Sequence, residues 1–139
     1  MATLNQPFSL DSSKGMTGRI TVTQVMDIQN NKSKVSIALE FKNTSYYGHQ
    51  YFLDGSISVD GSKIVSMSSS AGGHIANIKT KDTFYEVSSS PYTTTVSHLA
   101  DGSKTITVAV SVKGYERNGA GSNGFSLSKS TTVVLDTIP

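Results

Sequence analysis

Two short segments of the chain carry residue types found in serine hydrolases. His98 lies three residues before Asp101 in a serine-rich sequence, so a Ser-His-Asp arrangement can be drawn. No G-x-S-x-G segment is present to expose a nucleophilic serine. Residues 126–129 read SLSK and match the S-x-x-K motif, but the helix and partner motifs which that chemistry needs are missing. We therefore predict no catalytic residue and expect that the chain is not an enzyme.

The glycine-rich segment 119–124 reads GAGSNG and matches the G-x-G-x-x-G pattern of dinucleotide sites. In those sites the glycines join a strand to a helix, and the N-terminus of the helix holds the pyrophosphate. Here the residues that follow alternate as a strand does. We interpret the segment as a loop and predict no nucleotide cofactor.

Metal binding has little support in the sequence. The absence of cysteine excludes thiolate sites. Three aspartates could offer oxygen ligands, but no D-x-D-x-D-G calcium loop occurs, and a following glycine explains each of them as a turn residue. Three histidines are spread along the chain and would need the fold to bring them together. We predict no metal site. The residues considered are Asp54, Asp60, Asp101, His49, His74 and His98.

Tyrosines in and beside expected loops give the strongest indication of a binding function. Four of the candidates fall between residues 46 and 51, next to Phe52. Aromatic faces can stack on sugar rings, while nearby hydroxyls and amides bond to sugar hydroxyls. The alternative is that these rings pack over the ends of the fold, because a chain without Trp needs them there. The candidate ligand-binding residues are Tyr46, Tyr47, His49, Tyr51, Tyr92 and Tyr115.

The length and composition favour one globular domain with little charge. The chain has 139 residues, of which 36% are hydrophobic and 16% charged, with a formal net charge of +2. Its Lys and Arg residues are scattered, which argues against a nucleic-acid partner. No apolar run approaches the ~20 residues of a membrane span. We expect no membrane insertion, and the N-terminal residues do not resemble a signal peptide.

Alternating apolar residues predict strands throughout the chain. Residues 35–41 and 106–112 place an apolar side chain at every second position, as strands with one buried face do. Asp60-Gly61 is a strong hairpin signal, and Asp101-Gly102 predicts a second hairpin. Turn signals recur about every 8–12 residues. The predicted fold is all-β, an antiparallel β-sandwich of immunoglobulin-like or jelly-roll-like type with eight or nine strands and almost no helix.

The first strand candidate shows an irregular pattern. In residues 18–29, Ile20 and Val22 alternate with threonines, and the apolar positions then slip by one at Val25. We predict a β-bulge near Gln24 and Val25. Residues 1–16 predict an irregular N-terminal arm, residues 17–136 the sandwich, and residues 137–139 the start of an exit linker.

Several segments resemble minor structural proteins of tailed phages and prophages of Gram-positive bacteria. The most specific part runs from His98 through Asp101-Gly102-Ser103-Lys104-Thr105 into alternating β-branched residues. The second is the turn that contains Asp27, Asn30 and Asn31, before the strand at residues 35–41. The resemblance extends from about residue 18 to residue 139. It implies a virion component of the tail tip, baseplate or fibre, and it carries over no catalytic residue.

Three functions follow as hypotheses. The first is host attachment by binding a cell-wall polysaccharide, without cofactor, alongside other tail or baseplate proteins, with homo-oligomerisation left open. The second is a ligand-free structural spacer or docking domain. The third is a wall-degrading hydrolase, which would need two carboxylates facing each other in one cleft. The residues available for such a pair are Glu40, Asp54, Glu86 and Glu116.

Overall fold

The computed structural model describes residues 2–13, 15–43, 49–68, 74–80, 82–116 and 125–139. These residues contain ten strands and one short 3-10 helix, so the prediction of an all-β chain is confirmed. The elements are β1 (Ala2–Ser13), β2 (Met16–Asp27), η1 (Ile28–Asn30), β3 (Lys32–Asn43), β4 (His49–Val59), β5 (Ser62–Met67), β6 (Ile75–Ile78), β7 (Tyr85–Glu86), β8 (Tyr92–Ser97), β9 (Thr105–Glu116) and β10 (Phe125–Val134).

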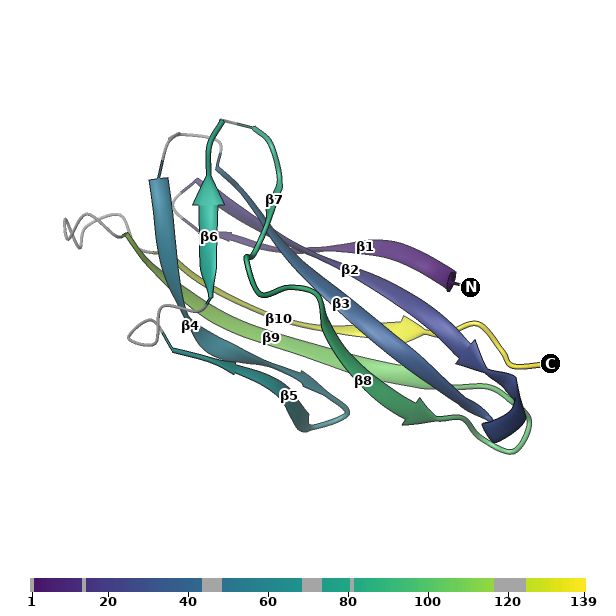
Figure 1. Cartoon of the computed structure of the whole chain (residues 1–139). Coiled ribbons are helices and arrows are strands. Elements are labelled where there is room, and N and C mark those ends of the chain that lie inside the picture. The colour runs from purple at the N-terminus through teal and green to yellow at the C-terminus, as the bar shows by residue number, and fades with distance from the viewer. Residues whose placement is uncertain (1, 14, 44–48, 69–73, 81, 117–124) are drawn as a thin grey trace.

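The strands form two antiparallel sheets that pack as a sandwich (Figure 1). Sheet A runs β1-β2-β3, and both β7 and β8 pair with the far side of β3. Sheet B runs β10-β9-β4, and both β5 and β6 pair with the far side of β4. The predicted antiparallel β-sandwich is therefore confirmed.

The core consists of the inward rows of both sheets. In β3 the four alternating apolar residues predicted from the sequence are fully buried, and the equivalent row of β9 is buried to the same degree. Each row faces the other sheet, since side chains two residues apart share one face of a strand. These rows are Val35, Ile37, Leu39 and Phe41 in β3, and Ile106, Val108, Val110 and Val112 in β9.

The N-terminal residues form a strand where we predicted an irregular arm. β1 pairs with β2 along most of its length and is the edge strand of sheet A. In the sequence, Gln6 and Pro7 interrupt an alternation that Leu4, Phe8 and Leu10 would otherwise show. An edge strand tolerates proline, because one side of its backbone has no ladder partner. The pairing with β2 therefore stabilises a strand that the local sequence pattern does not predict.

The predicted β-bulge in β2 is wrong, because a polar residue occupies a core position. β2 pairs with β3 without a register shift from Met16 to Asp27. Gln24 points inward and is fully buried, whereas Val25 points outward and is 37% exposed. The apolar residues change face at this point in the sequence, although the strand register stays constant. A register shift does occur nearby, but it lies in the pairing of β1 with β2, between Ala2 and Leu4.

The Asp101-Gly102 turn joins the two sheets and does not close a hairpin as predicted. It connects β8, which pairs with β3 in sheet A, to β9 in sheet B. Gly102 has a φ of +85°, and its N–H donates to Leu99 O at 2.8 Å. This left-handed conformation suits glycine and turns the chain from one layer into the other. The hairpin at Asp60-Gly61, by contrast, is present between β4 and β5.

The sandwich has two distinct ends (Figure 1). At the proximal end, β2 turns through η1 into β3, and the Asp101-Gly102 turn joins the sheets. Both chain termini also lie at this end. At the distal end, β3 stops at Asn43, β4 starts at His49, β9 stops at Glu116 and β10 starts at Phe125. The connections 44–48 and 117–124 between these strands lie outside the described residues.

Gly55 lies where β4 exchanges one neighbour for another. β4 pairs with β6 before it and with β5 from it onward, while β9 runs along the other side. Gly55 has a φ of +139°, and a Cβ there would lie 1.9 Å from Ser111 O. The backbone of β9 therefore occupies the space that a side chain would need.

Replacing Gly55 by Ala should be strongly destabilising. We expect Gly55→Ala to lower the free energy of unfolding by about 3 kcal/mol or more, because overpacking and backbone strain add. Gly61→Ala is the matched control. Gly61 also has a left-handed φ, +84°, but a Cβ there would meet nothing within 4 Å. The control should cost about 1 kcal/mol. Urea unfolding measures both, and equal losses would contradict the account.

Asp60 ties the β4–β5 turn to β9 through an ionised carboxylate. Its Oδ1 accepts from Thr107 N at 2.9 Å, and Lys104 Nζ lies 3.2 Å from its Oδ2. The hydrogen bond from Thr107 N–H does most to hold the pKa of Asp60 below its ordinary value of 3.8, burial opposes it, and Lys104 lowers the pKa further. Because the folded-state pKa is lowered, this carboxylate stabilises the fold above the unfolded pKa. That stability is lost as the pH falls through the folded pKa.

Asp60→Asn should therefore reduce stability at neutral pH more than at acid pH. Asp60 has a left-handed φ of +50°, which asparagine also tolerates, and asparagine keeps an oxygen acceptor but has no charge. We expect the difference in free energy of unfolding between wild type and Asp60→Asn to shrink between pH 6 and pH 3. Chemical denaturation at both values measures it. A difference that stays constant or grows on acidification would contradict the assigned role.

Candidate functional site

The six predicted site residues do not gather in one place. Tyr46 and Tyr47 lie outside the described residues, and His49 begins β4 with a side chain that is likewise outside them. Tyr51 is 1% exposed and packs edge-on against Phe125, with ring centroids 5.3 Å apart. Its ring is part of the core and presents no face to a ligand.

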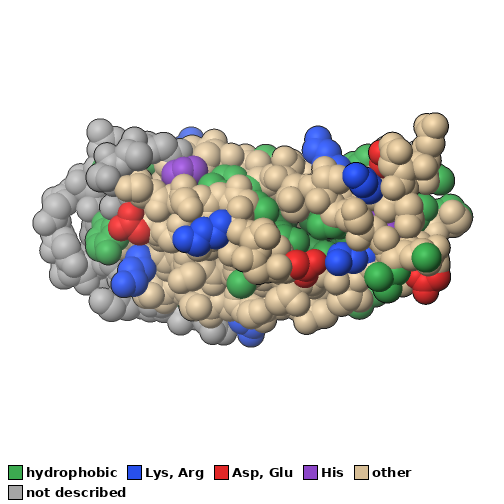
Figure 2. Space-filling view, turned by 90° about the horizontal axis from the view of Figure 1, so that it is seen from below, with side chains coloured by type: hydrophobic (Ala, Val, Ile, Leu, Met, Phe, Trp, Pro, Cys, Tyr) green, Lys and Arg blue, Asp and Glu red, His purple; other side chains and the backbone are tan. Residues whose placement is uncertain are grey.

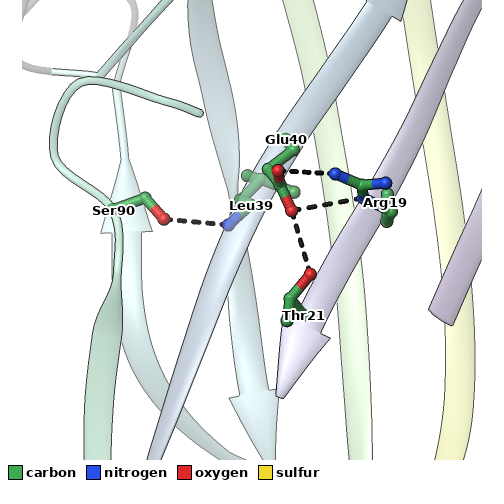
Figure 3. Close-up of polar contacts among 5 residues, drawn as sticks. All are labelled: Arg19, Thr21, Leu39, Glu40 and Ser90. Carbon is green, nitrogen blue, oxygen red and sulfur yellow. Dashed lines mark hydrogen bonds and ion pairs between the residues drawn. The ribbon is translucent and has the colours of Figure 1, made fainter. Parts of the chain in front are cut away.

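Tyr92 is also buried and belongs to a hydrogen-bonded cluster beside β8. Its hydroxyl lies 2.6 Å from Ser89 Oγ and 3.4 Å from His74 Nδ1. Burial raises the pKa of the Tyr92 hydroxyl, and the Ser89 hydrogen bond offsets part of that rise. Next to it, Ser90 Oγ accepts from Leu39 N at 2.9 Å (Figure 3). The cluster fastens the segment between β7 and β8 to sheet A.

Tyr115 is the predicted tyrosine that the structure shows at the surface. It lies near the end of β9 and is 47% exposed. Phe52 in β4 is its direct cross-strand partner, and the next pair on the same face is Asp54 with Lys113. Ser126 in β10 lies opposite Lys113. We call this outward group at the distal end of sheet B the distal surface. It comprises Phe52, Asp54, Lys113, Tyr115 and Ser126.

Charged side chains are dispersed over the visible surface. Figure 2 shows a face made mostly of uncharged polar side chains and backbone, over which the basic side chains are scattered, some of them beside an acidic one. A nucleic-acid site would need clustered cations to contact successive phosphates. The face in Figure 2 does not offer such a cluster.

An ion pair on the outer face of sheet A holds an aromatic ring in place. Arg19 Nη2 donates to Glu40 Oε2 at 2.8 Å, and Arg19 Nε donates to Oε1 at 3.3 Å (Figure 3). Thr21 Oγ1 donates to the same Oε1 at 2.9 Å. The Arg19 guanidinium lies 3.9 Å from the ring centroid of Phe84, and Lys42 Nζ lies 5.0 Å from it. These contacts seat the chain before β7 on the sheet.

Two of the carboxylates considered for hydrolysis are direct neighbours. Glu40 in β3 lies opposite Glu86 in β7. Both Glu40 oxygens accept hydrogen bonds, from Arg19 and from Thr21, so this carboxylate is held as the acceptor of an ion pair. A glycoside hydrolase needs one of its two carboxyl groups as a general acid with a proton to donate. Glu40 is instead held as an acceptor by Arg19 and Thr21. Within the described ranges, no group of three or more His, Asp or Glu side chains is placed to hold a metal ion.

A buried polar chain runs through the proximal end. Gln24 Nε2 donates to Ser33 Oγ at 2.9 Å, and Ser33 Oγ lies 2.7 Å from His98 Nε2. His98 Nδ1 lies 2.7 Å from Gly102 O. A carbonyl oxygen only accepts, so His98 Nδ1 carries a proton and donates it to Gly102 O. Both residues are buried, with Ser33 0% and His98 7% exposed.

The sequence drew attention to His98 but not to its partners. Gln24 in β2 and Ser33 in β3 both occupy inward, fully buried positions of their strands. A polar residue at a core position of a strand needs a hydrogen-bond partner, so the slip in the pattern at Gln24 was a usable signal. We interpreted it as a bulge instead.

One family is recognised in the chain. Residues 6–139 match the model of a siphovirus protein family of unknown function, DUF859. No curated protein and no solved structure matches the chain. Among the described residues there is no helix with the length and hydrophobicity needed to cross a membrane. Because the family model covers nearly the whole chain, this all-β sandwich belongs to the DUF859 family of siphovirus proteins, as the phage resemblance of its sequence predicts.

Proposed function

We propose that the domain is a host-attachment module of the phage tail or baseplate and binds a cell-wall polysaccharide through its distal end. One observation carries the proposal. Both termini lie at the proximal end, whereas the exposed Tyr115 and the rest of the distal surface lie at the opposite end (Figure 1). A domain joined to a larger assembly through its termini would present the distal surface outward. Membership of a siphovirus family supports a structural role in the virion.

The distal surface has the chemistry that sugar binding needs. Tyr115 offers an exposed ring beside the partly buried ring of Phe52. A sugar ring stacks its C–H groups on such a face, while polar neighbours bond to its hydroxyls. Asp54, Lys113 and Ser126 supply acceptors and donors on the same face. No bond is broken, and no cofactor takes part.

Attachment by this surface would rely on several copies. A single exposed tyrosine with a few polar neighbours supports only weak binding to one sugar unit. Linked copies on one particle raise the effective concentration of each site, and the polysaccharide itself repeats its units. Avidity therefore compensates for a shallow site.

The second candidate function is a spacer or docking domain without a ligand. The burial of Tyr51 and Tyr92 in the core supports it, because these rings serve packing. The placement of the termini supports attachment instead. A spacer in series extends a fibre when the chain enters at one end and leaves at the other. Here both termini share one end, which is the arrangement expected of a module that projects from its attachment point (Figure 1).

Tyr115→Ala should weaken binding to the polysaccharide without loss of folding. We expect about a tenfold loss of affinity, since a stacked aromatic contributes about 1.4 kcal/mol. The assay uses the whole chain displayed in many copies on fluorescent beads, with Gram-positive cells and purified wall polysaccharides as targets. Tyr46→Ala/Tyr47→Ala, at two further predicted site residues, is measured in the same assay.

Leu99→Ala is the matched control, because Leu99 is exposed but lies at the proximal end. It should bind as wild type does. Equal loss from Leu99→Ala and Tyr115→Ala would move the site away from the distal surface. No binding by the wild type to any target would favour the spacer function.

A further inference from the structure

One side of β8 has a row of backbone groups that no neighbouring strand covers. On its other side β8 pairs with β3, and the bond from His98 N to Asn31 O, 2.9 Å long, continues that ladder. Because an antiparallel ladder uses every second residue, the N–H and C=O groups of Thr93, Thr95 and Ser97 point away from β3. Within the described ranges, no strand pairs with that side of β8.

The other edge strands each have a feature that hinders pairing with a further strand. β1 contains Pro7 and two register shifts, and β5 has a register shift beside its exposed Lys63. In β10, Lys129 lies opposite the inward Val110, which puts a charge on the core-facing row of that edge. β6 and β7 have only four and two residues. Prolines, bulges, inward charges and short length are the usual means by which proteins block sheet edges.

β8 has none of these features. Its sequence is YTTTVS, six residues without charge, proline or glycine, and its pairing with β3 has no register shift. The side chains of Thr93, Thr95 and Ser97 are exposed on the outer face of sheet A. An uncharged, regular edge of this kind is a template for another strand. Of the edge strands that the structure describes, β8 is therefore the one open to pairing.

An apolar stripe lies beside this edge, on the open side of the sandwich between β8 and β5. Val96 in β8 and Ile64 and Val65 in β5 are partly buried against the core. The two strands approach each other at one end, where Tyr92 Oη lies 4.0 Å from Met67 Sδ. Figure 2 views the molecule from this side and shows hydrophobic side chains along the middle of the face. A strand added to β8 would cover part of this stripe and remove apolar surface from water.

We propose that β8 pairs antiparallel with β8 of a second copy of this chain, which joins the two A sheets into one. The strand is self-complementary about Thr95. With that residue opposite its own copy, Thr93 lies opposite Ser97 and Thr94 opposite Val96. An interface around a two-fold axis needs this match, because the same surface forms both sides. Opposed hydroxyl side chains stabilise strand pairs, and the outward backbone groups supply about six hydrogen bonds.

The lysines of β3 stay apart in this pairing. Lys34 lies beside Thr95, and three strand spacings, about 14 Å, separate it from its copy. That distance exceeds the Debye length of about 8 Å at physiological ionic strength. β8 lies in the proximal half of the sandwich, so both distal surfaces stay uncovered, at opposite ends of the pair (Figure 1). The inference is independent of the proposed sugar site.

Sedimentation equilibrium of the whole chain tests the proposal first. We expect the mean mass to rise reversibly toward twice the monomer mass between about 10 µM and about 1 mM, since so small an interface is weak. Over the same range, amide hydrogen exchange at Thr93, Thr95 and Ser97 should slow about fourfold, because their N–H groups enter a ladder. A chain that stays monomeric at the highest concentration, or a dimer without slower exchange there, would overturn the proposal.

Thr95→Lys tests the centre of the interface. Two like charges would then lie directly opposite each other, so we expect the dimer to weaken about tenfold or more. Circular dichroism checks that the fold is kept. Ser130→Lys is the matched control, because it adds the same charge at an exposed position of β10, another edge strand. It should dimerise as wild type does, and equal weakening by both substitutions would contradict the proposed interface.

Cysteine cross-linking gives a second readout that does not depend on weakening the dimer. Opposed residues of an antiparallel pair have Cα atoms about 5.5 Å apart, a distance that a disulfide spans. The chain has no cysteine of its own. We expect Thr95→Cys to oxidise to a covalent dimer about tenfold faster than Ser130→Cys. Equal rates for the two variants would refute pairing through β8.

Discussion

Side chains alternate between the two faces of every strand, so each sheet has one face that must be covered. The two inward rows cover each other, and all other features of the domain are arranged around that contact. The fully buried row of β3 and its counterpart in β9 supply most of the central layer. β3 and β9 have 12 residues each and run from one end of the sandwich to the other, so the same rows also define the proximal and distal ends.

The two ends are closed by different chemistry. At the distal end the closure is aromatic: Phe125 packs against Phe41 and Tyr51, with ring centroids 5.2 Å and 5.3 Å away. Phe125 also covers Gly114 on the neighbouring strand, where a Cβ would lie 2.1 Å from its ring. At the proximal end the closure is polar, through Gln24 and its partners. Because these rings close the core at the distal end, Tyr115 is not needed for that packing and lies at the surface beside them.

Much of the fold could be predicted because it follows from alternation and turn residues. The strands of the core and the Asp60-Gly61 hairpin required only the two-residue period and a glycine with positive φ. The errors have one physical source, which is the influence of residues far apart in sequence. β1 forms because β2 is beside it, and the Asp101-Gly102 turn changes sheets because β3 is the partner of β8.

The candidate site was less predictable than the fold. The candidate tyrosines could not be distinguished by their local sequence. Because side chains alternate along a strand, Tyr51 in β4 points into the core, whereas Tyr115 near the end of β9 points outward. Their neighbours on the distal surface come from three strands, and only the register of β4, β9 and β10 brings them together. That register cannot be predicted from the local sequence.

The orientation of the domain on the particle is the central claim, and cysteine labelling of intact phage tests it most directly. The chain has no cysteine, so a single one can be introduced at either end. Tyr115 and Leu99 are 47% and 62% exposed in the isolated domain, so Tyr115→Cys and Leu99→Cys should both react with a maleimide there. On assembled particles, the account predicts that Tyr115→Cys still reacts and Leu99→Cys is protected. Protection of Tyr115→Cys with free reaction of Leu99→Cys would contradict it.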